Sequence, residues 1–200
     1  MQIDGKIRRT EGWRVAFLLL ALFVQLGTGS PAAADALDGT LEVRSAYVNV
    51  DGGVFQLNAR MVFPLNDDIR RALKDGVTLY FDLQALVERR RRYWMDATVV
   101  DITLRRELSW HEVSERFVVR DVERGELENF TNLDQALQAI GTVDNWPVVV
   151  EPQLDADGSY EIRVRASVRR GSMPDALRTL IWWSDSWHRS SEWYSWSLPR

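Results

Sequence analysis

The sequence contains no cysteine among its 200 residues, and it has only two histidines. The absence of cysteine excludes disulfides, thiolate metal sites, a cysteine nucleophile and a lipid-modified N-terminal cysteine. Two histidines leave little material for acid–base catalysis or for a metal site. A net charge of −4 argues against binding to nucleic acid, because domains that bind nucleic acid normally present a basic surface.

The rest of the composition is that of a folded domain. Hydrophobic residues make up 46% of the chain and charged residues 27%, a balance that excludes wholesale disorder. The length suits a single hydrophobic core. The nine tryptophans are the unusual feature, and we expect no cofactor.

The N-terminus has the pattern of a secretory signal peptide. Basic residues lead into the mainly apolar segment 15–26, and the small residues that follow end in Ala32-Ala33-Ala34. Twelve residues of helix rise about 18 Å, less than the roughly 30 Å hydrocarbon core of a bilayer. We therefore expect residues 1–34 to be cleaved and the remainder to be exported to the periplasm; the alternative is an inner-membrane anchor formed by residues 15–26. No second apolar segment follows, so membrane insertion is expected only through a retained leader.

Five segments of the remaining chain alternate apolar and polar residues, which is the period of a half-buried β-strand. A turn at Asp51-Gly52-Gly53 joins the first two. One apolar and one charged face are typical of strands in an antiparallel sheet. The segments are Leu41–Val50, Val54–Phe63, Val77–Val87, Val100–Leu104 and Tyr160–Val168, with a shorter extended stretch that ends at Phe117–Val119.

Two or three short helices are expected between the strands. Asn66 precedes a segment with early acidic and late basic residues, and Gly76 follows it, which are signals of a helix start, dipole and end. Thr131 and Asp134 form a capping box ahead of a second helix that Gly141 closes. Pro174 indicates a third helical turn over residues 175–180.

Together these patterns predict a mainly β protein. Residues 35–200 are expected to form a single antiparallel β-sandwich domain, of which the immunoglobulin-like architecture is one form. The segment from Gly141 to Pro152 is expected to be a long connection. The turn Asp155-Ala156-Asp157-Gly158 is expected to be a hairpin turn before the strand at Tyr160.

Motifs spread over almost all of residues 35–200 carry a family resemblance. With them the chain resembles the bacterial domain of unknown function 4390 family, although Met173 stands where that pattern has leucine. The resemblance implies an exported proteobacterial protein, often encoded beside a nitrogen-regulation-type membrane sensor kinase, and it supplies no catalytic residues. The motifs are Asp75-Gly76-Val77, Arg91-Arg92-Tyr93-Trp94 with Asp96, Leu108-Ser109-Trp110-His111, Met173-Pro174-Asp175-Ala176 and the tail around Ser191-Glu192-Trp193-Tyr194.

No constellation in the sequence supports catalysis. Asp185, Ser186 and His188 lie too close along the chain to meet as a triad in an extended strand, and no Gly-x-Ser-x-Gly elbow surrounds the serine. His111 lacks the second histidine of a zinc helix. We therefore expect a protein that is not an enzyme, with no catalytic, cofactor-binding or metal-binding residues.

A run of four arginines, Arg89–Arg92, ends an apolar strand and is followed by Tyr93 and Trp94. One interpretation is a polar strand end that acidic neighbours neutralise. The other is a docking patch of Arg91, Arg92, Tyr93 and Trp94 for phospholipid headgroups or an acidic protein.

The tryptophans concentrate at the C-terminus. We expect the tail to pair with itself as a hairpin around Arg189-Ser190, with an aromatic face that seals the core. The alternative is an exposed platform of Trp187, Trp193 and Trp196 that stacks on sugars or anchors a partner. Five tryptophans lie in the last nineteen residues: Trp182, Trp183, Trp187, Trp193 and Trp196.

Two functions follow from these patterns. The favoured one is a non-enzymatic protein-interaction module of the envelope that acts beside a membrane sensor histidine kinase. The alternative is a glycan-binding module that uses exposed tryptophans against an envelope saccharide. The partner, the ligand and the oligomeric state stay open at this point.

Overall fold

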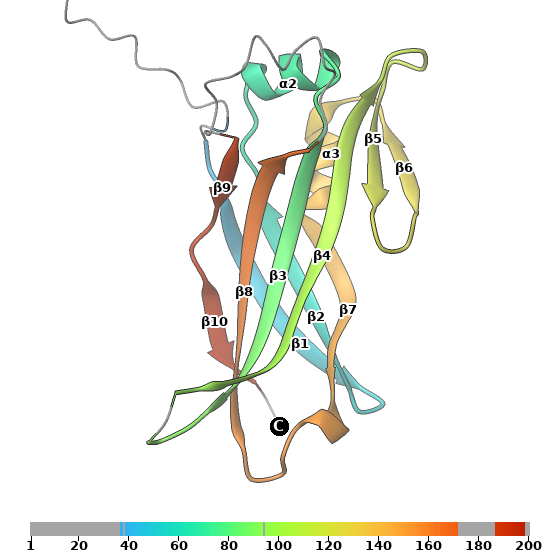
Figure 1. The fold of residues 1–200 in the computed structure, drawn as a ribbon. Helices are drawn as coiled ribbons and strands as arrows, with labels where there is room; N and C mark the ends of the chain where they lie inside the picture. The colour runs from blue at the N-terminus through green and yellow to red at the C-terminus, as the bar shows by residue number, and fades with distance from the viewer. Residues whose placement is uncertain (1–36, 38, 94, 172–186, 199–200) are drawn as a thin grey trace, which may run out of the picture. The chain divides into compact units, whose positions relative to one another are not determined.

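Two antiparallel β-sheets pack face to face in this protein (Figure 1). The computed structural model describes residues 37, 39–93, 95–171 and 187–198. The predictions for the leader, for Trp94 and for residues 172–186, including the third helix, lie outside the described residues. The elements are β1 Glu42–Asp51, β2 Val54–Val62, α2 Asp67–Lys74, β3 Leu79–Arg90, β4 Ala97–His111, β5 Arg116–Asp121, β6 Leu127–Phe130, α3 Leu133–Ile140, β7 Thr142–Val150, the 3₁₀ turn Glu151–Gln153, β8 Ser159–Arg170, β9 His188–Ser190 and β10 Tyr194–Ser197.

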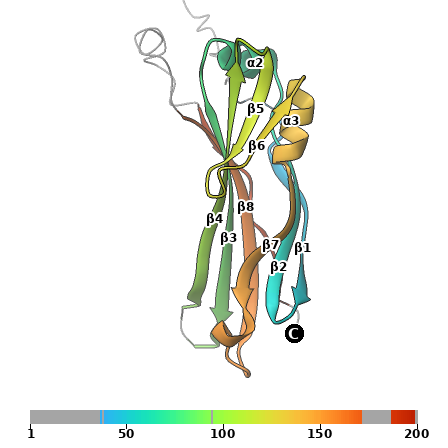
Figure 2. The ribbon, with the colours of Figure 1, turned by 90° about the vertical axis from the view of Figure 1, so that its right-hand side faces the viewer.

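The strands divide unequally between the two sheets. The smaller sheet has three strands in the order β1-β2-β7, and the larger has seven, in the order β10-β8-β3-β4-β5-β6 with β9 also paired to β8. Figure 2 shows the two layers from the side. Consecutive strands β3 to β6 are neighbours in the larger sheet, as in a meander. The predicted antiparallel β-sandwich is confirmed. Neither α2 nor α3 is long and apolar enough to cross a bilayer.

The alternating strands place their apolar faces in the core between the sheets. In β3 every second side chain from Leu79 to Val87 is at most 3% exposed, and in β8 the same is true from Ile162 to Val168. Successive side chains of a strand point to opposite faces, so the polar residues between them cover the outside of the sheet. Burial stabilises the fold by about 1.5–3 kcal/mol for each large apolar side chain, in a domain without disulfides.

The two described helices begin close to where their signals predict. The Asn66 side chain accepts a hydrogen bond from the Ile69 N–H at 2.8 Å, and Gly76 follows α2 with a φ of 88°. The capping box predicted at Thr131 is wrong by one residue. Asn132 is the N-cap of α3 and accepts from the Gln135 N–H at 2.8 Å, because asparagine caps at least as well as threonine.

The segment predicted to be a long connection, residues 141–152, consists mainly of strand β7, so that prediction is wrong. Two residues that are unusual in strands, Asn145 and Pro147, make the strand hard to recognise in the sequence. In the structure Asn145 has a φ of 51°. β7 accommodates both because it is an edge strand that pairs only with β2, with shifts of register along the pair.

The turn at residues 155–158 is present but does not form the predicted hairpin. The Gly158 N–H donates to the Asp155 carbonyl at 3.1 Å, yet the flanking strands β7 and β8 belong to different sheets. Turn residues mark a change of direction and carry no information about which strand the chain pairs with next.

The C-terminal tail forms an interrupted edge strand and not the predicted hairpin. Both β9 and β10 pair antiparallel with β8, beside residues 167–169 and 161–164 respectively. Between them Ser191, 8% exposed, continues the edge: its N–H donates to the Ala166 carbonyl at 2.8 Å, and its hydroxyl accepts from the Ala166 N–H at 3.1 Å. Alternation identifies strands but not their partners, which explains the error.

Candidate functional site

The outer face of the larger sheet is a lattice of ion pairs. Asp82 on β3 lies within it and is 9% exposed. Its carboxylate accepts hydrogen bonds from Arg105 on β4 at 2.7 and 3.0 Å and a longer one from Arg169 on β8 at 3.4 Å. The hydrogen bond to Asp82 raises the pKa of Arg105. One carboxylate thus joins three neighbouring strands.

Aromatic rings are part of the same lattice. The guanidinium carbon of Arg169 lies 4.7 Å from the ring centre of Tyr80, and those of Arg163 and Arg165 lie 4.7 and 4.4 Å from the ring centre of Trp193. Cations at such distances are attracted to the ring face. Trp193, a predicted binding residue, is therefore held against β8.

The other two predicted tryptophans, Trp187 and Trp196, are half-buried and pack against the core. Trp196 pairs with Ile162, whose side chain is fully buried, so it lies on the core side of the sheet. Trp193 lies over the arginines of the outer face. The described residues therefore do not assemble Trp187, Trp193 and Trp196 into one platform, and the glycan-binding alternative stays a prediction.

The predicted docking patch is the tip of the β3–β4 hairpin. Tyr93 is 83% exposed, Met95 is 90% exposed, and Arg91 and Arg92 are exposed as well. The Asp96 carboxylate accepts a hydrogen bond from the backbone N–H of Arg91 at 3.0 Å and closes the loop. Trp94, the fourth residue of the predicted patch, lies outside the described residues.

The four arginines at this end of β3 have different surroundings. Arg89 forms an ion pair with Asp155, and Arg90 forms one with Glu161 at 2.7 Å. Within the described part of the chain, the guanidinium groups of Arg91 and Arg92 have no carboxylate partner. A neutralised strand end accounts for the first two arginines but not for Arg91 or for Arg92, whose guanidinium carbon lies 5.8 Å from the ring centre of Tyr93.

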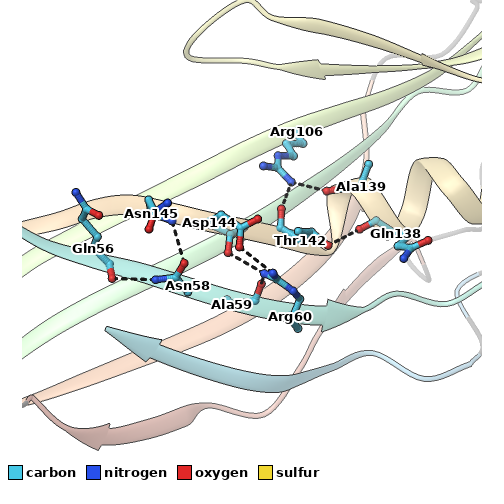
Figure 3. Close-up of polar contacts among 11 residues, drawn as sticks. Gln56, Asn58, Ala59, Arg60, Arg106, Gln138, Ala139, Thr142, Asp144 and Asn145 are labelled. Carbon is cyan, nitrogen blue, oxygen red and sulfur yellow. Dashed lines mark hydrogen bonds and ion pairs between the residues drawn. The ribbon is translucent and has the colours of Figure 1, made fainter. Parts of the chain in front are cut away.

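Arg106 closes the junction between α3 and β7 (Figure 3). It lies on the inward face of β4, and its Nη1 donates to the carbonyl oxygens of Ala139, Ile140 and Thr142 at 2.8–2.9 Å. Helix α3 has no basic residue in its last turn. The guanidinium of Arg106 on β4 therefore offsets the partial negative charge of the helix C-terminus. Burial lowers the pKa of Arg106.

Beside this junction, polar side chains support an irregular stretch of β7 (Figure 3). Asn58, 4% exposed, accepts a hydrogen bond at 3.1 Å from the backbone N–H of Asn145, the residue with positive φ. Arg60 donates to Asp144 at 2.8 Å and to the Val143 carbonyl at 3.1 Å. A strained backbone persists where its surroundings hold it, so these contacts have a structural role.

Two open depressions lie on either side of α3, with volumes of about 440 and 540 Å³. Gln138 and Thr142 line both, while Arg60 lines only the first and Arg106 only the second. Each of these guanidinium groups already donates to the protein, as described above. The depressions are therefore weak candidates for an anion site.

β1 presents the longest unpaired edge among the described strands. It pairs only with β2, and none of its ten residues makes a backbone hydrogen bond on the other side within the described residues. Residues 45–50 are uncharged, and Tyr47 and Val50 are 54% and 53% exposed. No signal in the sequence marks this edge, because edge and central strands share the same alternation.

The described residues contain no arrangement suited to catalysis. Nδ1 of His111 lies 2.8 Å from Oγ of Ser114 in an exposed turn. Within the same described ranges, no three His, Asp or Glu side chains are placed to hold a metal ion. Asp185 and Ser186 lie outside those ranges, so the expectation that the protein is not an enzyme stays a prediction.

Comparison with known families covers the whole sandwich. A family model described as a domain of unknown function, DUF4390, matches residues 38–197, which include every strand from β1 to β10. The chain belongs to the DUF4390 family. The resemblance predicted from the motifs is confirmed, and the hairpin tip, the ion-pair lattice and the β1 edge all lie inside the DUF4390 domain. No curated protein and no solved structure matches the chain.

Proposed function

We propose that this DUF4390 domain is a non-enzymatic protein-interaction module of the bacterial envelope that binds its partner by strand addition at β1. The observation that carries the proposal is the uncharged edge over residues 45–50, which has no strand partner among the described residues. Unpaired N–H and C=O groups along an edge are a template for another strand, and natural proteins normally protect such edges. Partner recognition by an added strand combines main-chain hydrogen bonds with side-chain contacts.

Most other edges of the sandwich carry such protection. Residues 97–104 of β4, which pair only with β3 among the described strands, contain the charged Asp101. β7 contains Pro147 and the irregular backbone at Asn145. β6, β9 and β10 have only three or four residues each. In β1 the protective features are confined to its start, where the register shifts between Val43 and Ser45 and Arg44 pairs with Glu42. No described strand pairs with the outer edge of the remainder of β1.

Location and partner class are supported by the sequence. The signal-peptide pattern of residues 1–34 favours export to the periplasm. The resemblance to exported proteins encoded beside sensor kinases favours a membrane sensor histidine kinase. An extended segment of that kinase with apolar side chains suits Tyr47 and Val50, which flank the edge.

The test is photo-crosslinking of the full-length chain in native membranes. A photoreactive amino acid at Val50 is compared with the same probe at Val113, which is 92% exposed on the β4–β5 turn. We expect the probe at position 50, and not at position 113, to capture a sensor histidine kinase identified by mass spectrometry.

A blocking variant sharpens the test. Tyr47→Lys with Asn49→Lys places two charges beside the edge at exposed positions, so capture is expected to fall at least about ten-fold while the circular dichroism stays unchanged. Equal capture from positions 50 and 113, or an adduct made of two copies of this chain, contradicts the proposal.

A further inference from the structure

The β3–β4 tip, defined by Arg91, Arg92, Tyr93 and Met95, exposes large side chains that neither the core nor the β1 edge uses. Tyr93 is 83% and Met95 90% exposed, and these two residues flank Trp94 in the sequence. Exposed apolar side chains that gather with cations mark interaction sites more often than isolated ones do. The tip lies at the end of two long strands, beyond their last paired residues (Figure 1).

Residues 91–96 carry a positive charge, because they contain two arginines and one aspartate. Two carboxylates from the loop before β8 and from β8, Asp155 and Glu161, form ion pairs with Arg89 and Arg90, whereas Asp157 in that loop is exposed. Asp96 is the one acidic residue in the sequence from 91 to 96, and the backbone N–H of Arg91 binds it. Arg91 and Arg92 are thereby left to attract an anion from outside the described fold.

We propose that the tip docks on the surface of an anionic phospholipid membrane. The two guanidinium groups bind headgroup phosphates, for which a planar, bidentate donor is well suited. Tyr93 and Met95 enter the interface between headgroups and acyl chains, where amphipathic aromatic rings are favoured. The combination of cations and apolar side chains on one small surface is typical of peripheral membrane contacts.

The small size of the tip favours a lipid surface over an acidic protein. A stable protein–protein interface buries about 800 Å² on each partner, which is more than a hairpin loop of a few residues supplies. A membrane needs no shape complementarity, and each residue of the tip adds to its attraction independently. This inference goes beyond the proposed function, because the β1 edge plays no part in it.

The other end of β4 provides a matched internal control. Its turn to β5 exposes Val113 at 92%, between Glu112 on one side and Glu115 two residues later. This turn is as exposed as the tip but carries negative charge, which an anionic surface repels. The two turns therefore predict opposite responses to the same membrane.

The experiment uses the absence of cysteine from the chain. Full-length Met95→Cys and Val113→Cys variants are each labelled with an environment-sensitive fluorophore. They are mixed with vesicles of phosphatidylglycerol and phosphatidylcholine, or of phosphatidylcholine alone. We expect a blue shift and quenching by spin-labelled lipid at position 95 on the anionic vesicles only, reduced by 0.5 M salt, and no change at position 113.

Substitution at the arginines tests the charge. Arg91→Gln with Arg92→Gln in the Met95→Cys background is expected to lower the response at position 95 at least about five-fold. No response at position 95, an equal response at position 113, or an equal response on phosphatidylcholine alone overturns the proposal. Capture of an acidic protein by a probe at position 95 without any vesicle response also overturns it. None of these measurements involves β1, so the proposed function stands or falls separately.

Discussion

Arginine and aromatic side chains occur together in two regions of this protein, with opposite surroundings. On the outer face of the larger sheet, Arg163 and Arg165 lie over Trp193, and Asp82 joins arginines from two neighbouring strands. At the β3–β4 tip, Tyr93 is 83% exposed, and its neighbouring arginines lack a carboxylate partner within the described residues. The same residue types form structure in one region and an unused surface in the other.

The two regions differ because residues within a sheet have cross-strand neighbours and residues at a hairpin tip do not. A residue in the middle of a sheet has cross-strand partners on both sides about 5 Å away, so a charged side chain finds its counter-ion there. A residue at a hairpin tip lies beyond its last cross-strand partner, as Arg91 and Arg92 do. Composition therefore does not distinguish an arginine that is paired in the sheet from one that is exposed at a turn; position in the sheet does.

The largest effect on stability is expected at Arg106. Arg106→Met removes the donor to three carbonyl oxygens at the end of α3, and we expect a loss of about 3 kcal/mol in the free energy of unfolding. Urea denaturation measures it. Arg106→Lys, which keeps the charge but not the planar fork, is expected to recover part of the loss. A loss below about 1 kcal/mol would mean that water satisfies these carbonyls.

Removal of the shared carboxylate is next in size. Asp82→Ala leaves Arg105 and Arg169 without their acceptor on β3, and we expect a loss of about 2 kcal/mol. Glu107→Ala, which breaks only the pair with the half-exposed Arg120, serves as the matched control and is expected to cost at most about 1 kcal/mol. Equal losses from the two variants in urea denaturation would mean that the shared carboxylate of Asp82 stabilises the fold no more than the single ion pair of Glu107 does.

A smaller effect on stability is expected at Trp193, the aromatic ring against which two arginines of β8 lie. Trp193→Ser removes the surface on which Arg163 and Arg165 lie, and the expected loss is about 1–2 kcal/mol. Trp193→Phe keeps a ring at this position and is expected to lose less. Thermal unfolding monitored by circular dichroism measures both. If neither variant shifts the midpoint, Trp193 is free to bind a ligand, as the glycan-binding alternative requires.

The smallest effect on stability is expected at the tip. Arg91→Gln, Arg92→Gln, Tyr93→Ser and Met95→Ser combined change only exposed side chains, so the free energy of unfolding is expected to change by less than about 0.5 kcal/mol. Urea denaturation beside the wild-type chain checks this. A large loss would show that the tip has a structural role and would remove the contrast between the two regions.

Much of the local structure follows from the sequence because its causes are local. The alternation from Leu79 to Val87 predicts a strand with one buried face, and the Asn66 and Gly76 signals place α2. β7 escapes prediction because Pro147 and Asn145 break its pattern, and only its edge position makes them acceptable. Arg91, Arg92 and Tyr93 are singled out by their order in the sequence, as a run of arginines followed by an aromatic residue, whereas Met95 is recognised only from its exposure.

The C-terminal tail shows the same limit. Its tryptophans predict an aromatic segment that packs inward, and Trp187 and Trp196 do pack against the core. The predicted hairpin is wrong because β8 offers both β9 and β10 an edge, and the tail follows that edge in two pieces. Trp193 turns to the other face, where two arginines of β8 lie within reach.

The sequence is sufficient to predict an antiparallel β-sandwich with capped short helices, since periodicity and capping act over a few residues. It also determined the family to which the chain belongs. Which strand edge and which arginines lack a partner among the described residues follows only from the tertiary structure. Strand pairing brings together residues far apart in the chain, such as Asp82 and Arg169, and this pairing decides which groups are neutralised and which remain exposed.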